Sequence, residues 1–329
     1  MPSFGRARRW ALAAVIGLLG ALPRPLAAQS VSGTIVGSVV DASGQVVAGA
    51  TVTLVNERTG ENRHTQSTQN GAFVFPALQP GAYTVRVELS GFQTHERQHN
   101  ILTANERLSV GELPLKTGEV VETITVTAQG ASVETDSSAR AALIDSKQLE
   151  MVAVRSRDIT AMLKVLPGVT ASDAYTEQES LGGSFGSRVP NISGARESFS
   201  TITVDGLAGN DMGTPAVFSS TLGFDSIGEV KVELTNYRAE SGRTGGASVS
   251  IVTKSGGQEF HGSLYGYKRH ESFNANDSIN NRNNVARPIY RHNNLGATLG
   301  GPLYVPGLFN EHKDKAFFFY SFEHLDTLT

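Results

Sequence analysis

Cysteine is absent from this chain of 329 residues. Disulfide bonds are therefore excluded, although exported proteins often use them. The absence also removes thiol nucleophiles and cysteine-ligated metals from the possible chemistry. Any folded part of the chain must be stabilised by sheet closure and side-chain packing.

The chain also lacks a marked excess of charge of either sign. Its formal net charge is −3 at pH 7. This balance gives no reason to expect nucleic acid as a partner and argues against a polybasic membrane patch. Glycine, in contrast, is frequent at 35 residues, and this usage favours many short strands joined by turns over helical bundles.

The N-terminus has the features of an export signal. Arg6, Arg8 and Arg9 precede the apolar run WALAAVIGLLGAL (Trp10–Leu22), and small residues ending in PLAAQS follow it. This order predicts a secretory signal peptide over residues 1–28, cleaved after Ala28. The alternative is a membrane anchor, but the run is shorter than the about 20 residues that a spanning helix needs.

Residues 29–117 predict a small all-β sandwich. Short β-prone runs alternate with the turn signals ASGQ, RTGE, QNG and LQPG, a spacing typical of antiparallel sandwiches. In YTVRVEL, every second residue from Tyr83 to Leu89 is apolar, so we expect that face in the core. The expected strands are Thr34–Val40, Ala50–Asn56, Ala72–Phe75, Gly81–Leu89 and Gln93–Leu102.

The stretches GSVVDASGQVVAGATVTLVN and TQNGAFVFPALQPGAYTVRVELSGFQ resemble the carboxypeptidase regulatory-like domain. The resemblance implies a transthyretin-like sandwich that serves as a non-catalytic module in exported proteins. It indicates a fold and says little about function.

A β-prone run, VVETITVTA (Val120–Ala128), follows within the polar linker formed by residues 118–131. A strand without a partner is an aggregation hazard, so a chain that keeps one should have something intended to pair with it. We expect this run to stay unpaired within its own chain and to pair with another protein.

Residues 132–256 predict a compact mixed α/β domain. Apolar residues recur at roughly helical spacing and indicate two short helices, the first capped by Asp145 or Ser146 and the second ended by Pro167-Gly168. The pair Asp205-Gly206 predicts a turn. The apolar residues are Leu149, Val152, Ile159, Met162, Leu163 and Leu166, and the expected strands are Thr201–Val204, Gly228–Leu234 and Ala247–Thr253.

Residues 257–329 predict antiparallel strands with aromatic ends. Leu295, Ala297 and Leu299 alternate with small or polar residues, and Phe318, Tyr320 and Phe322 share a face. This alternation is typical of transmembrane β-strands, although an ordinary soluble sheet fits it equally. The run NANDSINNRNN lacks the spacing of a calcium-binding loop and predicts a solvated loop.

Across residues 119–271 the chain resembles the plug region of TonB-dependent outer-membrane receptors, particularly the Oar-like group with a carboxypeptidase regulatory-like domain in front. The matching stretches are ETITVTA, LKVLPGV, TVDGL and AESGRTGGASVSIVTKSGGQEFHGSLYGY; NNLGATLGGPL and KAFFFYSFE look like the opening barrel strands. In that family the plug lies inside a barrel of about 22 strands.

The resemblance implies a TonB box that the TonB protein of the inner membrane captures as an added strand. It also implies an outer-membrane location with the N-terminal domain in the periplasm, contact with membrane lipid and uptake of an unknown ligand. Catalytic residues, metals and cofactors are not expected. The box residues are Glu122, Thr123, Ile124, Thr125, Val126, Thr127 and Ala128.

The barrel expected here is incomplete. The about 75 residues after residue 255 suffice for three or four membrane strands, whereas even the smallest single-chain barrels use about eight. An open edge in lipid leaves backbone groups unpaired. We therefore expect the N-terminal part of a longer receptor, or a truncated reading frame.

Other candidate sites are weaker. GGSFG (Gly182–Gly186) has the nucleophile-elbow spacing around Ser184 but lacks the strand before it and the helix after it. His95 and His99 are four residues apart in a region that predicts strand, so we expect surface residues and no metal site. ESGRTGG lacks the ending of a nucleotide-binding loop.

Two other functions stay open. The first is a secreted or surface protein whose sandwich mediates adhesion or carbohydrate binding, and the second is a hydrolase that uses Ser184. For the receptor, the ligand class stays open among siderophore, cobalamin, oligosaccharide and peptide, because extracellular loops largely determine it.

Overall fold

The computed structural model describes most of the chain from residue 32 onward, and no helix among the described residues has the length and apolarity that crossing a membrane requires. Residues 1–28, Glu122, Ala128 and Ser184 lie outside the described residues. The described residues are 32–118, 123–127, 138–151, 157, 159–170, 187–188, 191–195, 199–209, 216–217, 222–237 and 245–328.

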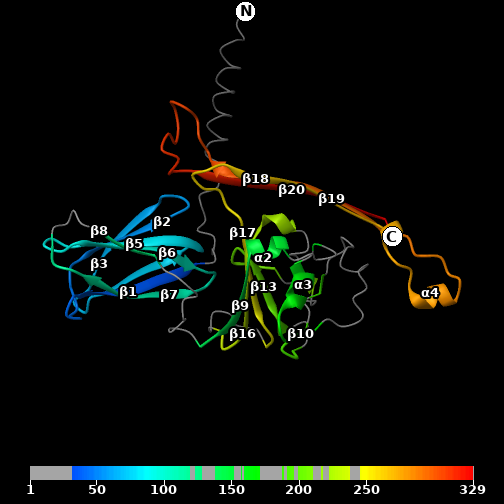
Figure 1. The fold of residues 1–329 in the computed structure, drawn as a ribbon, viewed down its shortest axis with the longest axis horizontal. Coiled ribbons are helices and arrows are strands. Elements are labelled where there is room, and N and C mark those ends of the chain that lie inside the picture. The colour runs from blue at the N-terminus through cyan, green and yellow to red at the C-terminus, as the bar shows by residue number, and fades with distance from the viewer. Residues whose placement is uncertain are drawn as a thin grey trace, which may run out of the picture. The chain divides into compact units, whose positions relative to one another are not determined.

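The first part of the chain forms two β-sheets, which we call the N-terminal sandwich (Figure 1). One sheet has the strand order β4-β1-β7 and the other has the order β3-β2-β5-β6-β8. The strands are β1 (Gly33–Asp41), β2 (Thr51–Asn56), β3 (Asn62–Gln66), β4 (Ala72–Leu78), β5 (Gly81–Glu88), β6 (Thr94–Leu102), β7 (Arg107–Leu115) and β8 (Thr123–Thr127).

Alternation along the strands builds the core of the sandwich. Tyr83, Val85 and Val87 of β5 are buried in a cluster with side chains from both sheets, and Leu89 packs against its edge. The Tyr83 hydroxyl donates a hydrogen bond to the Gln79 carbonyl at 2.7 Å, which satisfies its polar end. The predicted core face of this strand is therefore confirmed.

Two strands of the sandwich were not predicted. The sequence of β3, NRHTQ, is polar and carries no core pattern. In β7, Leu108 and Val110 are buried, and so are Leu113 and Leu115, but an extra residue separates the two pairs. The register against β1 shifts at this point and Gly111 has a φ of 70°. This β-bulge interrupts the period of two that identifies a strand in sequence.

The middle part is a mixed α/β unit with a five-stranded sheet of order β14-β13-β17-β16-β9. Two short pairs accompany it, β10 (Val169–Thr170) with β12 (Asn191–Ile192) and β11 (Ser187–Arg188) with β15 (Ala216–Val217). The main strands are β9 (Arg140–Asp145), β13 (Thr201–Val204), β14 (Leu207–Ala208), β16 (Ile227–Thr235) and β17 (Ser248–Thr253).

The two predicted helices are present as α2 (Ser146–Met151) and α3 (Ile159–Met162), the latter continued by the 3₁₀ turn η1 (Leu163–Val165). A reciprocal cap starts α2: the Gln148 amide donates to the Asp145 carboxylate at 2.8 Å, and the Asp145 amide donates to the Gln148 side chain at 3.2 Å. Buried apolar side chains attach the helices to the sheet core, namely Leu149, Ile159, Met162 and Leu163.

The predicted turn after β13 is also confirmed. Asp205 and Gly206 both have positive φ, 48° and 84°, as a tight hairpin requires. The Asp205 carboxylate accepts hydrogen bonds from the Thr253 amide at 2.9 Å and the Thr253 hydroxyl at 2.8 Å. Asp205 therefore joins two strands of the sheet, which accounts for its position without a ligand.

The last part is a three-stranded antiparallel sheet of β18 (His261–His270), β19 (Arg291–Pro302) and β20 (Phe317–Leu328) (Figure 1). Its register places Leu264, Ala297 and Phe322 side by side across the strands. The loop between β18 and β19 contains the 3₁₀ turn η6 (Glu271–Phe273), the short helix α4 (Ser278–Arg282) and mostly exposed residues, as a solvated loop should.

Candidate partner-binding segment

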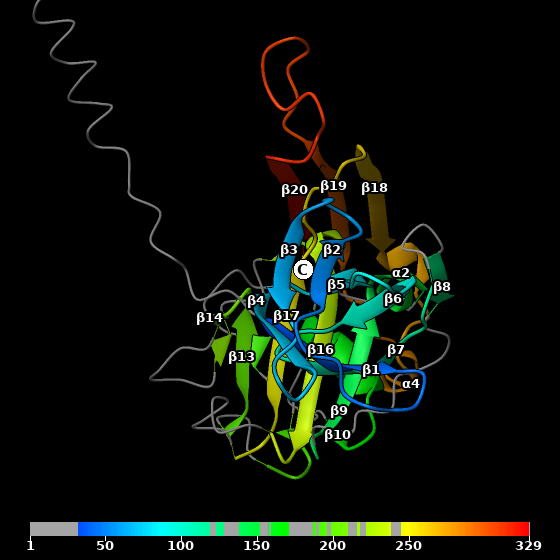
Figure 2. The same ribbon diagram turned by 90° about the vertical axis from the view of Figure 1, so that its left-hand side faces the viewer.

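The segment predicted to bind a partner is a strand at its described residues. Thr123–Thr127 form β8, which pairs in parallel with β6 over the register from Thr94 opposite Thr123 to Gln98 opposite Thr127. Figure 2 shows β8 beside β6 at the end of its sheet. The predicted strand is present, but the expectation that it stays unpaired in its own chain is wrong.

The physical reason lies in β6. Without β8, β6 would be the last strand of its sheet and would present a row of unpaired amides and carbonyls. An extended segment of the same chain that lies nearby satisfies those groups at little entropic cost. The sequence of Thr123–Thr127 shows β-propensity, but no pattern in it indicates which strand it will pair with.

The pairing covers the straight part of β6. Beyond Gln98 the strand has a bulge, because Arg97 lies opposite Val85 whereas Asn100 lies opposite Tyr83. His99 has a φ of 60° in this bulge. The Asn100 side chain donates to the carbonyls of Tyr83 at 2.9 Å and Arg97 at 2.7 Å, which fixes the bend. The bulge therefore ends the edge that β8 can follow.

The two histidines of β6 have different environments. His95 lies opposite Ile124 of β8 and is buried, and its burial, together with the charge of Arg97, lowers its pKa below the ordinary value of 6.5. The His99 ring is 66% exposed and lies 2.9 Å from the Glu57 carboxylate. The expectation that both are surface residues is therefore wrong for His95.

Among the residues that the structure describes, no group of three or more His, Asp or Glu side chains is placed to hold a metal ion. Arg97 and the bulge also separate His95 from His99 along the strand.

Contacts before β8 guide the chain to the start of β6. Gln93 donates its amide to the Lys116 carbonyl at 2.8 Å, and Gly118 donates its amide to the Gly91 carbonyl at 3.2 Å. Between them, Phe92 and Thr117 form an antiparallel bridge. A side chain at position 118 would meet the Gln93 side chain at 2.7 Å, so glycine allows the two segments to lie close. The chain leaves the sandwich immediately beside Thr94.

The C-terminal sheet has one apolar and one polar face. Exposed apolar side chains from all three strands share one face: Leu264, Leu295, Leu299, Tyr320 and Phe322. On the other face the Tyr265 hydroxyl donates to the Glu323 carboxylate at 3.0 Å, and the Ser263 and Thr298 hydroxyls lie 2.8 Å apart. The predicted alternation is confirmed, and an exposed apolar band of this kind suits contact with lipid.

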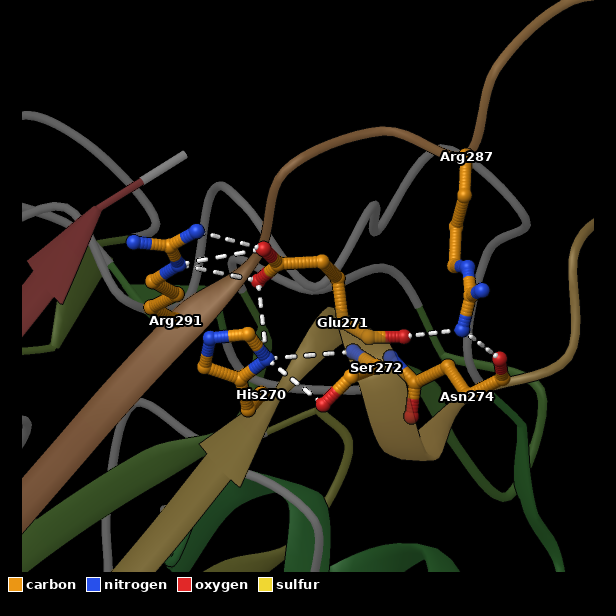
Figure 3. Close-up of polar contacts among 6 residues, drawn as sticks. All are labelled: His270, Glu271, Ser272, Asn274, Arg287 and Arg291. Atoms are coloured by element: carbon orange, nitrogen blue, oxygen red, sulfur yellow. Dashed lines mark hydrogen bonds and ion pairs between the residues drawn. The ribbon is translucent and has the colours of Figure 1, made fainter.

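Polar contacts organise the loop between β18 and β19 (Figure 3). The Glu271 carboxylate accepts from Arg291 Nη2 at 2.8 Å and from Arg291 Nε at 3.1 Å. Hydrogen bonding from Arg291 lowers the pKa of Glu271 to about 2. The Arg287 guanidinium donates to the carbonyls of Glu271 and Asn274, so this arginine closes the loop onto its own start.

His270 takes part in this cluster as an acceptor. Its Nδ1 accepts from the Ser272 amide at 3.1 Å and lies 2.9 Å from the Ser272 hydroxyl. A nitrogen that accepts from an amide carries no proton. The same nitrogen lies 3.5 Å from the Glu271 carboxylate, and Arg291 is the closer charged partner of that carboxylate at 2.8 Å.

Comparisons with known proteins match both ends of the described chain. Residues 34–116 match the carboxypeptidase regulatory-like domain, and residues 252–329 match an outer membrane beta barrel domain. The TonB-dependent transporter Oar of Myxococcus xanthus is 29% identical over 313 residues, which cover 90% of this chain and 27% of the transporter. The chain thus spans about a quarter of that relative's length.

Solved structures with partial similarity include two siderophore receptors. The siderophore receptor PirA from Acinetobacter baumannii is 23% identical with a TM-score of 0.38, over 50% of this chain and 22% of that receptor. PirA from Pseudomonas aeruginosa is 19% identical with a TM-score of 0.33, over 50% of this chain and 26% of that receptor.

The chain therefore resembles a TonB-dependent transporter over most of its own length, and its two ends match a carboxypeptidase regulatory-like domain and an outer membrane beta barrel domain. Its fold is mostly β, with a carboxypeptidase regulatory-like domain and a fragment of an outer-membrane barrel. The barrel match also favours an outer-membrane location over the secreted or surface adhesion protein that was the alternative.

Proposed function

We propose that this chain is the N-terminal, force-receiving part of a TonB-dependent outer-membrane receptor, and that the receptor transports a ligand and is not an enzyme. In this proposal residues 1–28 are a signal peptide and residues 29–117 are a transthyretin-like sandwich. Residues 118–131 contain the TonB box in a linker, residues 132–256 are the plug, and residues 257–329 begin the barrel.

The observation that carries the proposal is the extended conformation of Thr123–Thr127 at a sheet edge. A segment that TonB captures must be able to add as a strand through its main-chain groups. In the structure this segment adds as a strand to the edge of β6, and along the chain it precedes the α/β unit. Force applied there would reach the α/β unit through the linker that follows, as opening a plug requires.

The C-terminal sheet supports the membrane part of the proposal. A strand that faces lipid on one side and a plugged lumen on the other needs one apolar and one polar face, and β18, β19 and β20 have both. A barrel in lipid must close, because an open edge leaves backbone groups without partners.

The placement of the N-terminal sandwich follows from the same logic. TonB reaches the receptor from the inner membrane, so the strand that it captures must lie in the periplasm. Strand β7 of the sandwich ends at Leu115, shortly before that strand begins at Thr123. We therefore propose a periplasmic location for the sandwich and the box, and outer-membrane lipid as the surroundings of the barrel.

Binding of the purified C-terminal domain of TonB to the detergent-solubilised receptor tests the proposal. Deletion of Glu122–Ala128 is expected to abolish binding, because the captured strand is lost. Deletion of residues 131–137, an equally long segment that begins at the last residue of the linker, is the matched control and should leave binding intact. Undiminished binding after the first deletion would show that the box lies elsewhere.

A further inference from the structure

We propose that the edge of β6 is an intramolecular docking site for β8, so that TonB and the N-terminal sandwich compete for the same strand. The proposal rests on the assignment of Glu122–Ala128 as the TonB box. It goes further because it gives the sandwich a role, which is to hold the coupling segment when TonB is absent.

The docking site has a defined length. It begins after the bridge between Phe92 and Thr117 and ends at the bulge after Gln98. The straight edge between these limits is Thr94–Gln98, and every residue of this edge has a register partner in β8. The edge and the segment therefore match in length and direction.

The attachment of the chain favours docking. Hydrogen bonds at Lys116 and Gly118 hold the chain beside residues 91–93, which directly precede β6. Only residues 119–122 separate this anchor from Thr123. A tether of only four residues gives an effective concentration on the order of millimolar for the attached segment. At such a concentration, even weak pairing keeps β8 on the edge of β6 most of the time.

Competition follows from the use of main-chain groups. Each edge of a strand offers one row of amides and carbonyls, and the row of β8 that faces β6 is already paired. A partner that captures β8 through this row can do so only after β8 leaves the sandwich. A partner that used the outer row would bind without release, and the experiments below separate the two cases.

Disulfide cross-linking tests the docking directly, because the chain contains no cysteine of its own. Glu96 and Thr125 are register partners, and neighbouring strands are about 4.8 Å apart, within the roughly 4.4–6.8 Å that a disulfide spans between Cα atoms. In the purified receptor the pair Glu96→Cys with Thr125→Cys should oxidise to a disulfide in high yield.

The control pair is Gln98→Cys with Thr123→Cys. These positions lie on the same two strands but are displaced by about 13 Å along them, so docking in the observed register predicts little cross-linking. Equal yields for the two pairs, or no cross-link for the first, would overturn the docking site.

Lengthening the tether tests the competition without altering either strand. Insertion of about 20 Gly and Ser residues between Gly118 and Glu119 lowers the effective concentration of β8 by roughly tenfold. The apparent Kd of the TonB C-terminal domain should fall by up to roughly tenfold. The same insertion between Gln129 and Gly130 leaves the tether to β6 unchanged and should leave the Kd unchanged.

The outcomes separate this proposal from the assignment of the TonB box. Equal Kd values for the two insertion variants would overturn competition, although TonB binding that depends on Glu122–Ala128 would leave the box assignment intact. Efficient cross-linking together with no TonB binding to any variant would uphold the docking of β8 and overturn both the box assignment and the competition.

Discussion

Glu271 and Arg291 illustrate how single residues shape the loop between β18 and β19. We expect Glu271→Gln to loosen this loop, because Arg291 then loses its charged partner. Amide hydrogen exchange over residues 271–290 should become faster. The control is Asp277→Asn, which removes one charge from the same loop but keeps a side chain able to cap α4; equal acceleration in both variants would contradict the role given to Glu271.

The same contact has a predictable pH dependence. The pKa of Glu271 is lowered from 4.5, the value of the unperturbed group, to about 2 in the folded protein. A lowered pKa means that the contribution to stability is present above the unperturbed value and is lost as the pH falls toward the folded value. Loop protection in the wild type should therefore persist at about pH 5 and decline only in stronger acid.

His95 also makes the stability of the N-terminal sandwich decrease as the pH falls. Burial lowers its pKa below 6.5, so the unfolded chain binds the proton more readily than the folded domain does. Stability is full above about pH 6.5 and decreases as the pH falls below that value. Denaturant midpoints of a fragment of residues 32–131, which contains the sandwich with its own core, should show this loss between about pH 8 and about pH 5.

A pair of variants isolates the contribution of His95. His95→Gln should flatten the pH dependence, and His99→Asn is the comparison variant on the same strand, because Asn tolerates the positive φ at that position. A pH dependence that survived His95→Gln would locate the titrating group elsewhere.

The structural roles of several residues could be predicted from the preferences of their side chains. The capping role of Asp145 and the turn at Asp205-Gly206 follow from side-chain preferences that act over two or three residues, and the structure confirms both. The burial of His95 was not predictable in this way, because it depends on β6 and its neighbours in the fold. A polar residue in a β-prone run gives no signal of the strand that will lie beside it.

At the scale of whole elements, strands were predictable where the period of two was unbroken. β5 and β13 follow the expected residues closely, whereas β7 was missed because the extra residue at its bulge reverses the alternation. Parallel pairing of β6 with β8 was missed for a different reason. Its two strands are separated by β7, which belongs to the other sheet, and such long-range pairing leaves no local pattern.

The two faces of β20 lead to a prediction at this scale. Phe322 belongs to the exposed apolar face and its neighbour Ser321 to the opposite face. If the apolar face contacts lipid, Phe322→Lys should destabilise the barrel by about 2–4 kcal/mol, since a charge near the bilayer midplane costs that much. Ser321→Lys should be tolerated better, because substitutions facing the lumen avoid this cost.

The yield of folded receptor in the outer membrane, measured by the heat-dependent shift in gel mobility, compares the two variants. Phe322→Lys should reduce the yield and Ser321→Lys should reduce it less. A stronger loss for Ser321→Lys would mean that the lipid-facing side of the sheet has been assigned to the wrong face.

At the scale of the whole chain, the order of parts was readable because each part has its own composition. The sandwich, the α/β unit and the two-faced sheet differ in strand length, helix content and polarity, and each difference appears in the sequence. The pairing of β6 with β8, in contrast, could not be predicted from the sequence. It appears only when β6 is seen to need a neighbour and residues 116–118 are seen to hold the chain beside that edge.

The central claim is that Thr123–Thr127 serve two partners in turn, the sandwich and TonB. The most direct measurement is TonB C-terminal domain binding to the receptor carrying Glu96→Cys and Thr125→Cys, before and after reduction. The oxidised receptor should fail to bind, because the disulfide holds β8 on β6, and reduction should restore binding. Equal binding by the oxidised and reduced forms would contradict the claim.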